Sequence, residues 1–339
     1  MRGKLMDLKE KIGTYLDQIK RIRGVENAVL TQRDGNPIQS SGVWFSKDEI
    51  FNVSSATSAI YNVGIHIHPH DLKYILIEGR KAKILIAPLQ GSIHHSLNRI
   101  INKQGIFESD NEYFIAITAQ PDTNLGGIFL QTRECLKQIK TTLITSGESF
   151  KPPLIQFNEE QVQKILNSFN VKENEENQLE IKPFSLNLSD NLLFELRKVL
   201  NNFSIAILDL HYAHVTIEGG FIASKILKQN PIQTKNNIDK LSAMSYSLFQ
   251  TANRCAWLLK KMNADTILLD CEYTFHFIYG MDRAIFSAEI GKFKQKLGLI
   301  RLIIPQFSRK INNILKEASQ IKIPKTFDIK SILGELIIK

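Results

Sequence analysis

The residues with the most evident potential for chemistry are histidines, and three of the eight alternate within one stretch, residues 66–71. In an extended chain alternate side chains point to one side, so these histidines and the aspartate that ends the stretch could bind a zinc ion. The candidate ligands are His66, His68, His70 and Asp71. The alternative is a polar helix end before a strand, held by Pro69. We favour this alternative and expect no metal, because no paired cysteine or second compact ligand pair accompanies the histidines.

A second candidate group consists of Glu272 and Asp282 near His276, which would suit acid–base chemistry. Both carboxylates lie at predicted hairpin ends, where charged residues are ordinary, so we expect no active site there. The sequence has no Gly-x-x-x-x-Gly-Lys-Ser/Thr phosphate loop, no Gly-x-Gly-x-x-Gly after a strand, no Gly-x-Ser-x-Gly elbow and no His-Glu-x-x-His. We therefore expect a protein that is not an enzyme and uses no cofactor.

A chain of 339 residues predicts two domains with ample buried cores. The longest apolar runs fall well short of the roughly 18 residues of a membrane span, and the charged opening stretch does not resemble a signal peptide. The three cysteines are far apart and show no Cys-x-x-Cys spacing. They predict a reduced, cytoplasmic setting.

The net charge is +9, and the excess is mostly lysine in the C-terminal half. Such a surface is either solvated or binds an acidic protein or an anionic membrane. Arginine clusters with interleaved aromatic residues are missing, so nucleic acid is not an expected partner. The candidate docking residues are Lys292, Lys294, Lys296 and Arg301, with Arg309 and Lys310 continuing the basic run.

Hydrophobic spacing predicts the order α-β-β-α-β-β-β-α for the first 143 residues. The hairpin at 24–42 has turn chemistry in Arg33-Asp34-Gly35-Asn36, and a capping box of Ser46 and Glu49 opens a small-residue-rich helix that ends near Gly64. The later elements are strands at Tyr74–Ile77, Ala82–Ala87 and Tyr113–Ile117, a helix at Leu125–Leu143, and an insertion at 91–110 with a short amphipathic helix.

The same order is predicted again from Ser185. Its elements are a helix at Asn191–Phe203, strands at Ser204–Leu210 and His214–Gly219, a helix at Asn236–Met262, strands at Thr266–Asp270, Thr274–Tyr279 and Ala284–Ile290, and a helix at Leu297–Ala318. The repeats align Ala28-Val29-Leu30 with Ala206-Ile207-Leu208, Gly42 with Gly220, Tyr74–Glu78 with Thr266–Asp270, and Leu125-Gly126 with Leu297-Gly298. Between the copies, an acidic, proline-containing stretch with a short helix around Glu159–Phe169 reads as a linker.

Several of these motifs together resemble the Roadblock family of dynein light chains and small-GTPase regulators. Residues 24–30 with Arg33-Asp34-Gly35 and Pro37-Ile38 are similar to that family's first hairpin, and Asn124–Phe129 and Leu297–Arg301 are similar to the start of its last helix. The resemblance covers residues 1–143 and, less closely, 185–318. The second copy departs from the pattern where His211-Tyr212-Ala213 replaces the Asp-Gly turn, and where Pro305 should kink or shift the last helix.

The resemblance implies an α+β fold of two tandem Roadblock-type (profilin-like) modules, each a five-stranded antiparallel sheet with helices on both faces. The expected domains are 1–143 and 185–319, with a linker at 144–184 and a tail at 320–339. It also implies pairing through the third strand and second helix, here as an internal pseudo-dimer or, alternatively, as a homodimer between chains. The expected pairing residues are Phe51, Ser55, Ser58, Tyr74, Leu76, Ser245, Thr266 and Leu268.

The function that the resemblance implies is a non-catalytic platform that regulates or scaffolds small Ras-like GTPases. Any stimulation of hydrolysis would act through the partner's own catalytic residues, and the protein would reach a membrane peripherally through its partner. Two alternatives remain: a sensory module that binds a small ligand, and a structural adaptor in a motor-like or membrane-tethering complex. The tail, with Ile332, Leu333 and Ile337, could dock within or between chains.

Overall fold

The computed structural model describes residues 8–42, 46–69, 71–89, 113–146, 184–228, 238–260 and 262–322. Its helices are α1 (Leu8–Lys20), α2 (Lys47–Ile67), α4 (Leu125–Ser146), α7 (Asp190–Ala206), the 3-10 turn η1 (Glu218–Gly220), α8 (Ile238–Lys260) and α9 (Leu297–Glu317). Its strands are β1 (Val25–Gln32), β2 (Pro37–Gly42), β3 (Leu72–Glu78), β4 (Lys83–Pro88), β5 (Tyr113–Ala119), β6 (Phe184–Asn187), β7 (Leu210–Ile217), β8 (Ile222–Leu227), β9 (Thr266–Cys271), β10 (Thr274–Gly280), β11 (Ala284–Gly291) and β12 (Ser319–Lys322). None of the described helices is long and apolar enough to span a bilayer.

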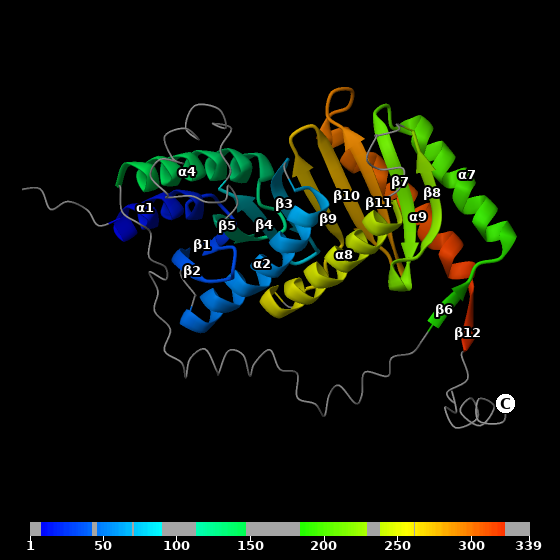
Figure 1. The fold of residues 1–339 in the computed structure, drawn as a ribbon, viewed down its shortest axis with the longest axis horizontal. Coiled ribbons are helices and arrows are strands. Elements are labelled where there is room, and N and C mark those ends of the chain that lie inside the picture. The colour runs from blue at the N-terminus through cyan, green and yellow to red at the C-terminus, as the bar shows by residue number, and fades with distance from the viewer. Residues whose placement is uncertain are drawn as a thin grey trace, which may run out of the picture.

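One sheet of ten strands runs through the described part of the chain, in the order β2-β1-β5-β4-β3-β9-β10-β11-β7-β8 (Figure 1). Every neighbouring pair in it is antiparallel. Counted outward from the central β3–β9 pair, the strands are β3, β4, β5, β1 and β2 on one side and β9, β10, β11, β7 and β8 on the other. The two halves of the sheet therefore have the same strand order. The expected α+β class with an antiparallel sheet is therefore confirmed.

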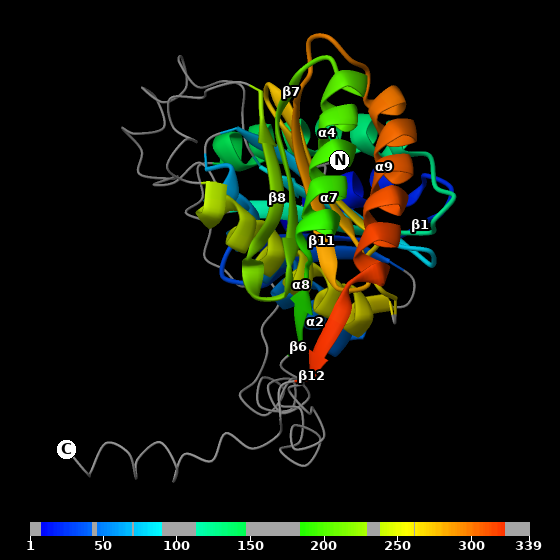
Figure 2. The ribbon, with the colours of Figure 1, turned by 90° about the vertical axis from the view of Figure 1, so that its right-hand side faces the viewer.

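Helices cover both faces of this sheet and divide the apolar interior into two cores. On one face α1, α4, α7 and α9 pack through residues such as Ile12, Ile139, Phe203 and Ile304. On the other face α2 and α8 lie together over the sheet (Figures 1 and 2), burying residues such as Ile60 and Leu248. Because a strand exposes alternate side chains to opposite faces, nearly every strand residue contributes to one core or the other.

Helix α2 begins at the predicted capping box, in which the Glu49 backbone N–H donates to Ser46 Oγ at 3.2 Å and the Ser46 N–H donates to Glu49 Oε2 at 2.8 Å. The helix ends later than Gly64, because the His68 backbone N–H still donates to the Gly64 carbonyl at 3.0 Å. His66 therefore lies on the last helical turn. The favoured interpretation of this stretch, a polar helix end before a strand, agrees with the structure, and His66 and His68 do not alternate on an extended segment.

The first hairpin of the second half was predicted in the wrong register. Helix α7 continues through Ser204 to Ala206, where Ser204 is buried while Ile205 is 75% exposed. The first strand of this half is instead β7, whose order of buried and half-buried positions is the same as that of β1. Val25 thus corresponds to Leu210, and the alignment of Ala28-Val29-Leu30 with Ala206-Ile207-Leu208 does not hold.

The turn that was thought to be missing from the second half is present further along the chain. His211, Tyr212 and Ala213 lie inside β7, and the turn is η1, with Gly219 and Gly220 at φ 79° and 84°. Gly220 corresponds to Gly35 (φ 96°) rather than to Gly42. A Cβ on Gly35 would lie 3.3 Å from the Ser55 Cα, and one on Gly220 would lie 3.0 Å from the Ala243 Cα, so both turns need glycine for the same two reasons.

A small two-stranded sheet was not predicted. Strand β6 pairs with β12 below the ends of α7 and α9 (Figure 2), with Ser319 opposite Asn187. These strands cross the boundaries expected at 184/185 and 319/320. Pro305 lies inside α9, which continues to Glu317. The insertion at 91–110, the linker helix at 159–169 and the tail residues Ile332, Leu333 and Ile337 lie outside the described residues.

Candidate functional site

The two halves of the sheet meet where β3 pairs with β9, a contact we call the seam. Leu76 lies directly opposite Leu268, Tyr74 opposite Asp270, and Glu78 opposite Thr266. Leu76 and Leu268 are each 1% exposed. The structure therefore brings together, in one seam, four of the residues expected in module pairing.

The expected helix residues lie elsewhere in the contact. The Ser58 hydroxyl donates to the Arg33 carbonyl, and Ser55 packs against Gly35, so both serines face their own hairpin turn. Phe51 is half-buried on α2 and Ser245 is fully buried on α8. One direct hydrogen bond between α2 and α8 runs from Cys255 Sγ to the Ala56 carbonyl at 3.4 Å, and no pattern in the sequence signals this pair.

Ion pairs and backbone bonds close the seam at both ends. The Arg301 guanidinium, from α9, lies 2.5 Å from Glu78 Oε2 of β3. At the same end the Asp265 N–H donates to the Glu78 carbonyl at 2.8 Å, and at the other end the Glu272 N–H donates to the Asp71 carbonyl at 2.7 Å. These contacts join residues 187 to 223 positions apart and hold the two halves in one register.

The four docking candidates divide into two kinds. Lys292 is half-buried, paired with Asp270 and lying 4.6 Å over the Phe275 ring, and Arg301 is engaged at the seam. Lys294 has a side chain 62% exposed and lies 3.4 Å from Asp209, while Lys296 is exposed before α9. Only the second kind has the exposure that a docking residue needs.

The acid–base candidates lie apart from one another. Glu272 lies in the β9–β10 turn and pairs with Lys73 at 2.6 Å, and Asp282 is exposed in the β10–β11 turn. His276 is fully buried in β10. Its side chain points into a polar cluster under α2 and α8.

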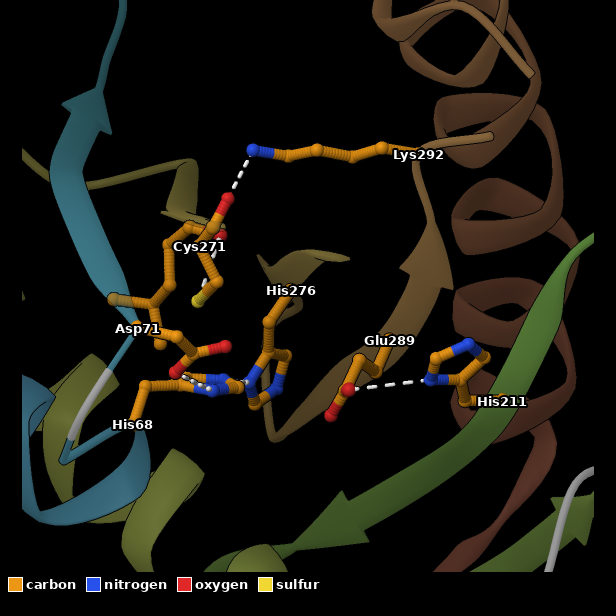
Figure 3. Close-up of polar contacts among 8 residues, drawn as sticks. His68, Asp71, His211, Cys271, His276, Glu289 and Lys292 are labelled. Atoms are coloured by element: carbon orange, nitrogen blue, oxygen red, sulfur yellow. Dashed lines mark hydrogen bonds and ion pairs between the residues drawn. The ribbon is translucent and has the colours of Figure 1, made fainter. Parts of the chain in front are cut away.

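This cluster contains one of the predicted histidines and crosses the seam. His68, at the end of α2, places Nε2 at 3.0 Å from Nδ1 of His276 (Figure 3). On its other side His68 Nδ1 lies 3.6 Å from Asp71 Oδ1. His276 Nε2 contacts the Ser287 hydroxyl of β11 at 2.7 Å. His66 instead bonds the Asn62 carbonyl through Nδ1 at 2.6 Å, and His70 lies outside the described residues.

Electrostatics keep the cluster neutral at its centre. Burial lowers the pKa of His276 well below its ordinary value, and the nearby His68 and His214 add to this effect. Burial acts to raise the pKa of Asp71, but its hydrogen bond and charge interaction with His68 outweigh it, so that pKa is lowered. One arrangement of protons satisfies these polar atoms: His68 Nδ1 points its proton toward Asp71, His276 Nδ1 donates to His68 Nε2, and Ser287 donates to His276 Nε2.

Within the described sheet strands, the buried histidines of this region belong to the second half. By sheet register His276 corresponds to Ile84, and His214 of β7 corresponds to Val29. His214 is fully buried, with Nδ1 at 2.8 Å from Thr216 Oγ1. The alternation Phe275-His276-Phe277 signals a buried histidine in a strand, but no pattern in the sequence links it to His68.

Together these features define an α+β protein whose two half-sheets meet through their edge strands β3 and β9, under a helix pair. No family model matches the sequence, and no curated protein matches it. Among solved structures, the chain is similar to the Roadblock/LC7 domain from Streptomyces avermitilis (14% identity, TM-score 0.31), covering 39% of this chain and 97% of that one.

It is also similar to MglB from Myxococcus xanthus (14% identity, TM-score 0.34), covering 39% of this chain and 95% of that one. The gliding protein MglB from Thermus thermophilus is 18% identical (TM-score 0.35), with 40% of this chain and 98% of that one covered. Solved Roadblock-type structures are thus what this chain is similar to over about two fifths of its length.

Proposed function

We propose that this chain is a non-catalytic platform that binds and regulates small Ras-like GTPases, built from two Roadblock-type modules paired within one chain. The modules span residues 1–143 and 185–319, with 144–184 as linker and 320–339 as tail. The observation that carries the proposal is the seam, where β3 and β9 join two half-sheets of the same strand order. The Roadblock-like motifs at the first hairpin and at the start of the last helix supply the functional class.

Symmetry about the seam supports internal pairing. Leu76 and Leu268 hold matching positions in their half-sheets and lie directly opposite each other. On their other sides they face Leu85 of β4 and Phe277 of β10. A local two-fold axis therefore passes between the two leucines, which is the relation expected of two paired copies. The linker raises the effective concentration of one module near the other.

The pseudo-dimer presents two unlike halves to a partner. The second half carries the buried strand histidines His214 and His276, and Lys296 just before α9 and Arg309 and Lys310 within it are exposed. Leu299 and Leu302, on the same helix, are 51% and 68% exposed. Such a mixed apolar and basic face suits a protein partner with an acidic rim better than bare solvent. The asymmetry favours one partner per chain.

Pull-down with Ras-like GTPases loaded with GDP or a GTP analogue tests the proposal. We expect retention that depends on the nucleotide and weakens with salt. The double substitution Lys294→Glu and Lys296→Glu should weaken binding, whereas Lys137→Glu, on the exposed side of α4, should not. Equal retention with both nucleotides, or none with any GTPase, contradicts the proposal.

The pairing mode has its own test. Light scattering should give the mass of one chain, 38.7 kDa, at all concentrations. A dimer in which two copies of residues 1–143 pair with each other would contradict internal pairing.

A ligand-binding module is the second candidate, because a cavity of about 620 Å³ lies at the end of α8. Lys20, Glu26, Asn27 and Lys260 are among its lining residues. Lys260 and Glu26 form an ion pair in its lining. A small molecule that copurifies with the protein, with no GTPase bound, would favour this reading.

A further inference from the structure

The cluster across the seam has the composition of a metal site. His68, His276 and Glu289 each offer one ligand atom, and these atoms lie within 4.8 Å of one another. Figure 3 shows His276 between the side chains of His68 and Glu289. His68 and His276 are 8% and 0% exposed, and Glu289 is half-buried. No platform function described above uses these residues.

The facing nitrogens of the two histidines have nearly the spacing of two ligands of one ion. Two nitrogen ligands of a tetrahedral zinc ion, with bonds of about 2.0–2.1 Å, lie about 3.3 Å apart. Nε2 of His68 and Nδ1 of His276 face each other at 3.0 Å. An ion between them would displace the single proton that they share, and His276 would then donate from Nε2 to Ser287.

The outer atoms of all three ligands have partners that fix their orientation. Asp71 lies at 3.6 Å from the second nitrogen of His68, and Ser287 lies at 2.7 Å from that of His276. Glu289 Oε1 lies 3.3 Å from His211 Nδ1. Histidine ligands of zinc usually donate their other ring N–H to such a carboxylate, carbonyl or hydroxyl.

A competing set is His68, Asp71 and Cys271, whose ligand atoms also lie within 4.8 Å of one another. It fits less well, because Asp71 approaches the nitrogen of His68 that points away from His276. The Cys271 thiol meanwhile points toward the Leu269 carbonyl, 3.9 Å away. This set does not contain His276, so the facing nitrogens of His68 and His276 would not share the ion.

We propose that His68, His276 and Glu289 bind one zinc ion, with Asp71, Ser287 and His211 as the outer partners. His68 comes from the first half of the chain, and the other two ligands come from β10 and β11 of the second half. The ion therefore links the halves beside the seam. Binding to the folded chain stabilises it by mass action, in addition to any partner binding. A fourth position remains for water, as in other three-ligand zinc sites.

The test is metal content and affinity of the full chain without an affinity tag. Native mass spectrometry and elemental analysis should find one zinc per chain, and added zinc should raise the Tm of the apoprotein. His276→Gln and Glu289→Gln should each abolish both effects. Asp71→Asn should weaken zinc binding by about 10- to 100-fold, measured by competition with a chelator.

His66→Gln is the matched control, because His66 is exposed and two positions from His68. It should retain zinc with unchanged affinity. The far-UV circular dichroism of each variant shows whether the sheet has formed, and Glu289→Gln, on a half-buried residue, keeps the test valid if His276→Gln does not fold. Less than stoichiometric zinc in the wild type, or equal loss in His66→Gln, would overturn the proposal.

Discussion

Replacing His214 by valine is expected to make the protein less sensitive to acid. His214 is fully buried, and burial lowers its pKa to about 3, with the charge of Lys225 on β8 adding to the effect. Its Nε2 has no hydrogen-bond partner among the described residues. The corresponding residue of the first half is Val29, so the same sheet position accepts valine.

The sign follows from where each state binds the proton. In the unfolded chain His214 takes up a proton below about pH 6.5, whereas in the folded chain it stays neutral down to about pH 3. Between these values the unfolded state binds more protons, so the free energy of unfolding falls as the pH falls. The slope is about 1.4 kcal/mol per pH unit, which gives a loss of about 2–3 kcal/mol between pH 6.5 and 4.5.

The other groups that face His214 are present in both proteins. Tyr212 stacks on its ring with centroids 5.9 Å apart, Ser287 lies opposite it on β11, and His276 lies one strand further. Burial is the largest cause of the lowered pKa of His276, and the charge interactions with His68 and His214 add to it. The difference between the two proteins therefore reports His214 together with its interaction with His276.

The assay is urea unfolding followed by far-UV circular dichroism, at about pH 7.5 and about pH 4.5, with a chelator present. The wild type should lose about 2–3 kcal/mol more than His214→Val over this interval. His66→Gln, which changes an exposed histidine, should behave as the wild type. Equal losses in the wild type and His214→Val would refute the reasoning that burial holds this histidine neutral.

Three further substitutions test the seam and the turns by equilibrium unfolding. Leu268→Ala removes a buried side chain opposite Leu76 and should cost about 2–5 kcal/mol, and a cost below about 1 kcal/mol would mean that the seam is loosely packed. Gly220→Ala should lower the free energy of unfolding by more than about 1 kcal/mol, because Gly220 has a positive φ and lies close to the α8 backbone. Gly35→Ala should lower it somewhat less, and no loss in either variant would contradict the turn assignment. Glu78→Gln breaks the part-buried pair with Arg301 and should cost about 1–2 kcal/mol, less in high salt, and an effect independent of salt would argue against an ion pair.

Local chemistry predicted most of the first half. The capping box at Ser46 and Glu49 and the Asp-Gly turn each depend on residues within four positions of one another, so the sequence alone reveals them. The hairpin of the second half was misread because Ile205 to Leu208 forms an apolar run. Ile205 and Leu208 are nonetheless 75% and 68% exposed. Helix α7 continues to Ala206 because Phe203, on its buried side, packs in the core. The hydrophobicity of a residue does not by itself predict whether its side chain faces the core or the solvent.

The polar cluster could not be predicted for a different reason. His68 and His276 are 208 residues apart and meet only because β3 pairs with β9 in one register. A shift of that pairing by one residue would turn every side chain of one strand to the opposite face. The histidine stretch drew attention to the correct segment, but its partners depended on a tertiary contact.

The seam also decides how the protein responds to dilution. When two separate chains pair, the number of assembled pairs at low abundance falls with the square of the chain count. In this protein the third strands of the two half-sheets pair within one polypeptide, so each folded chain carries the complete ten-stranded sheet. With the proposed internal pairing, a cell with only a few copies would therefore hold as many assembled sheets as folded chains.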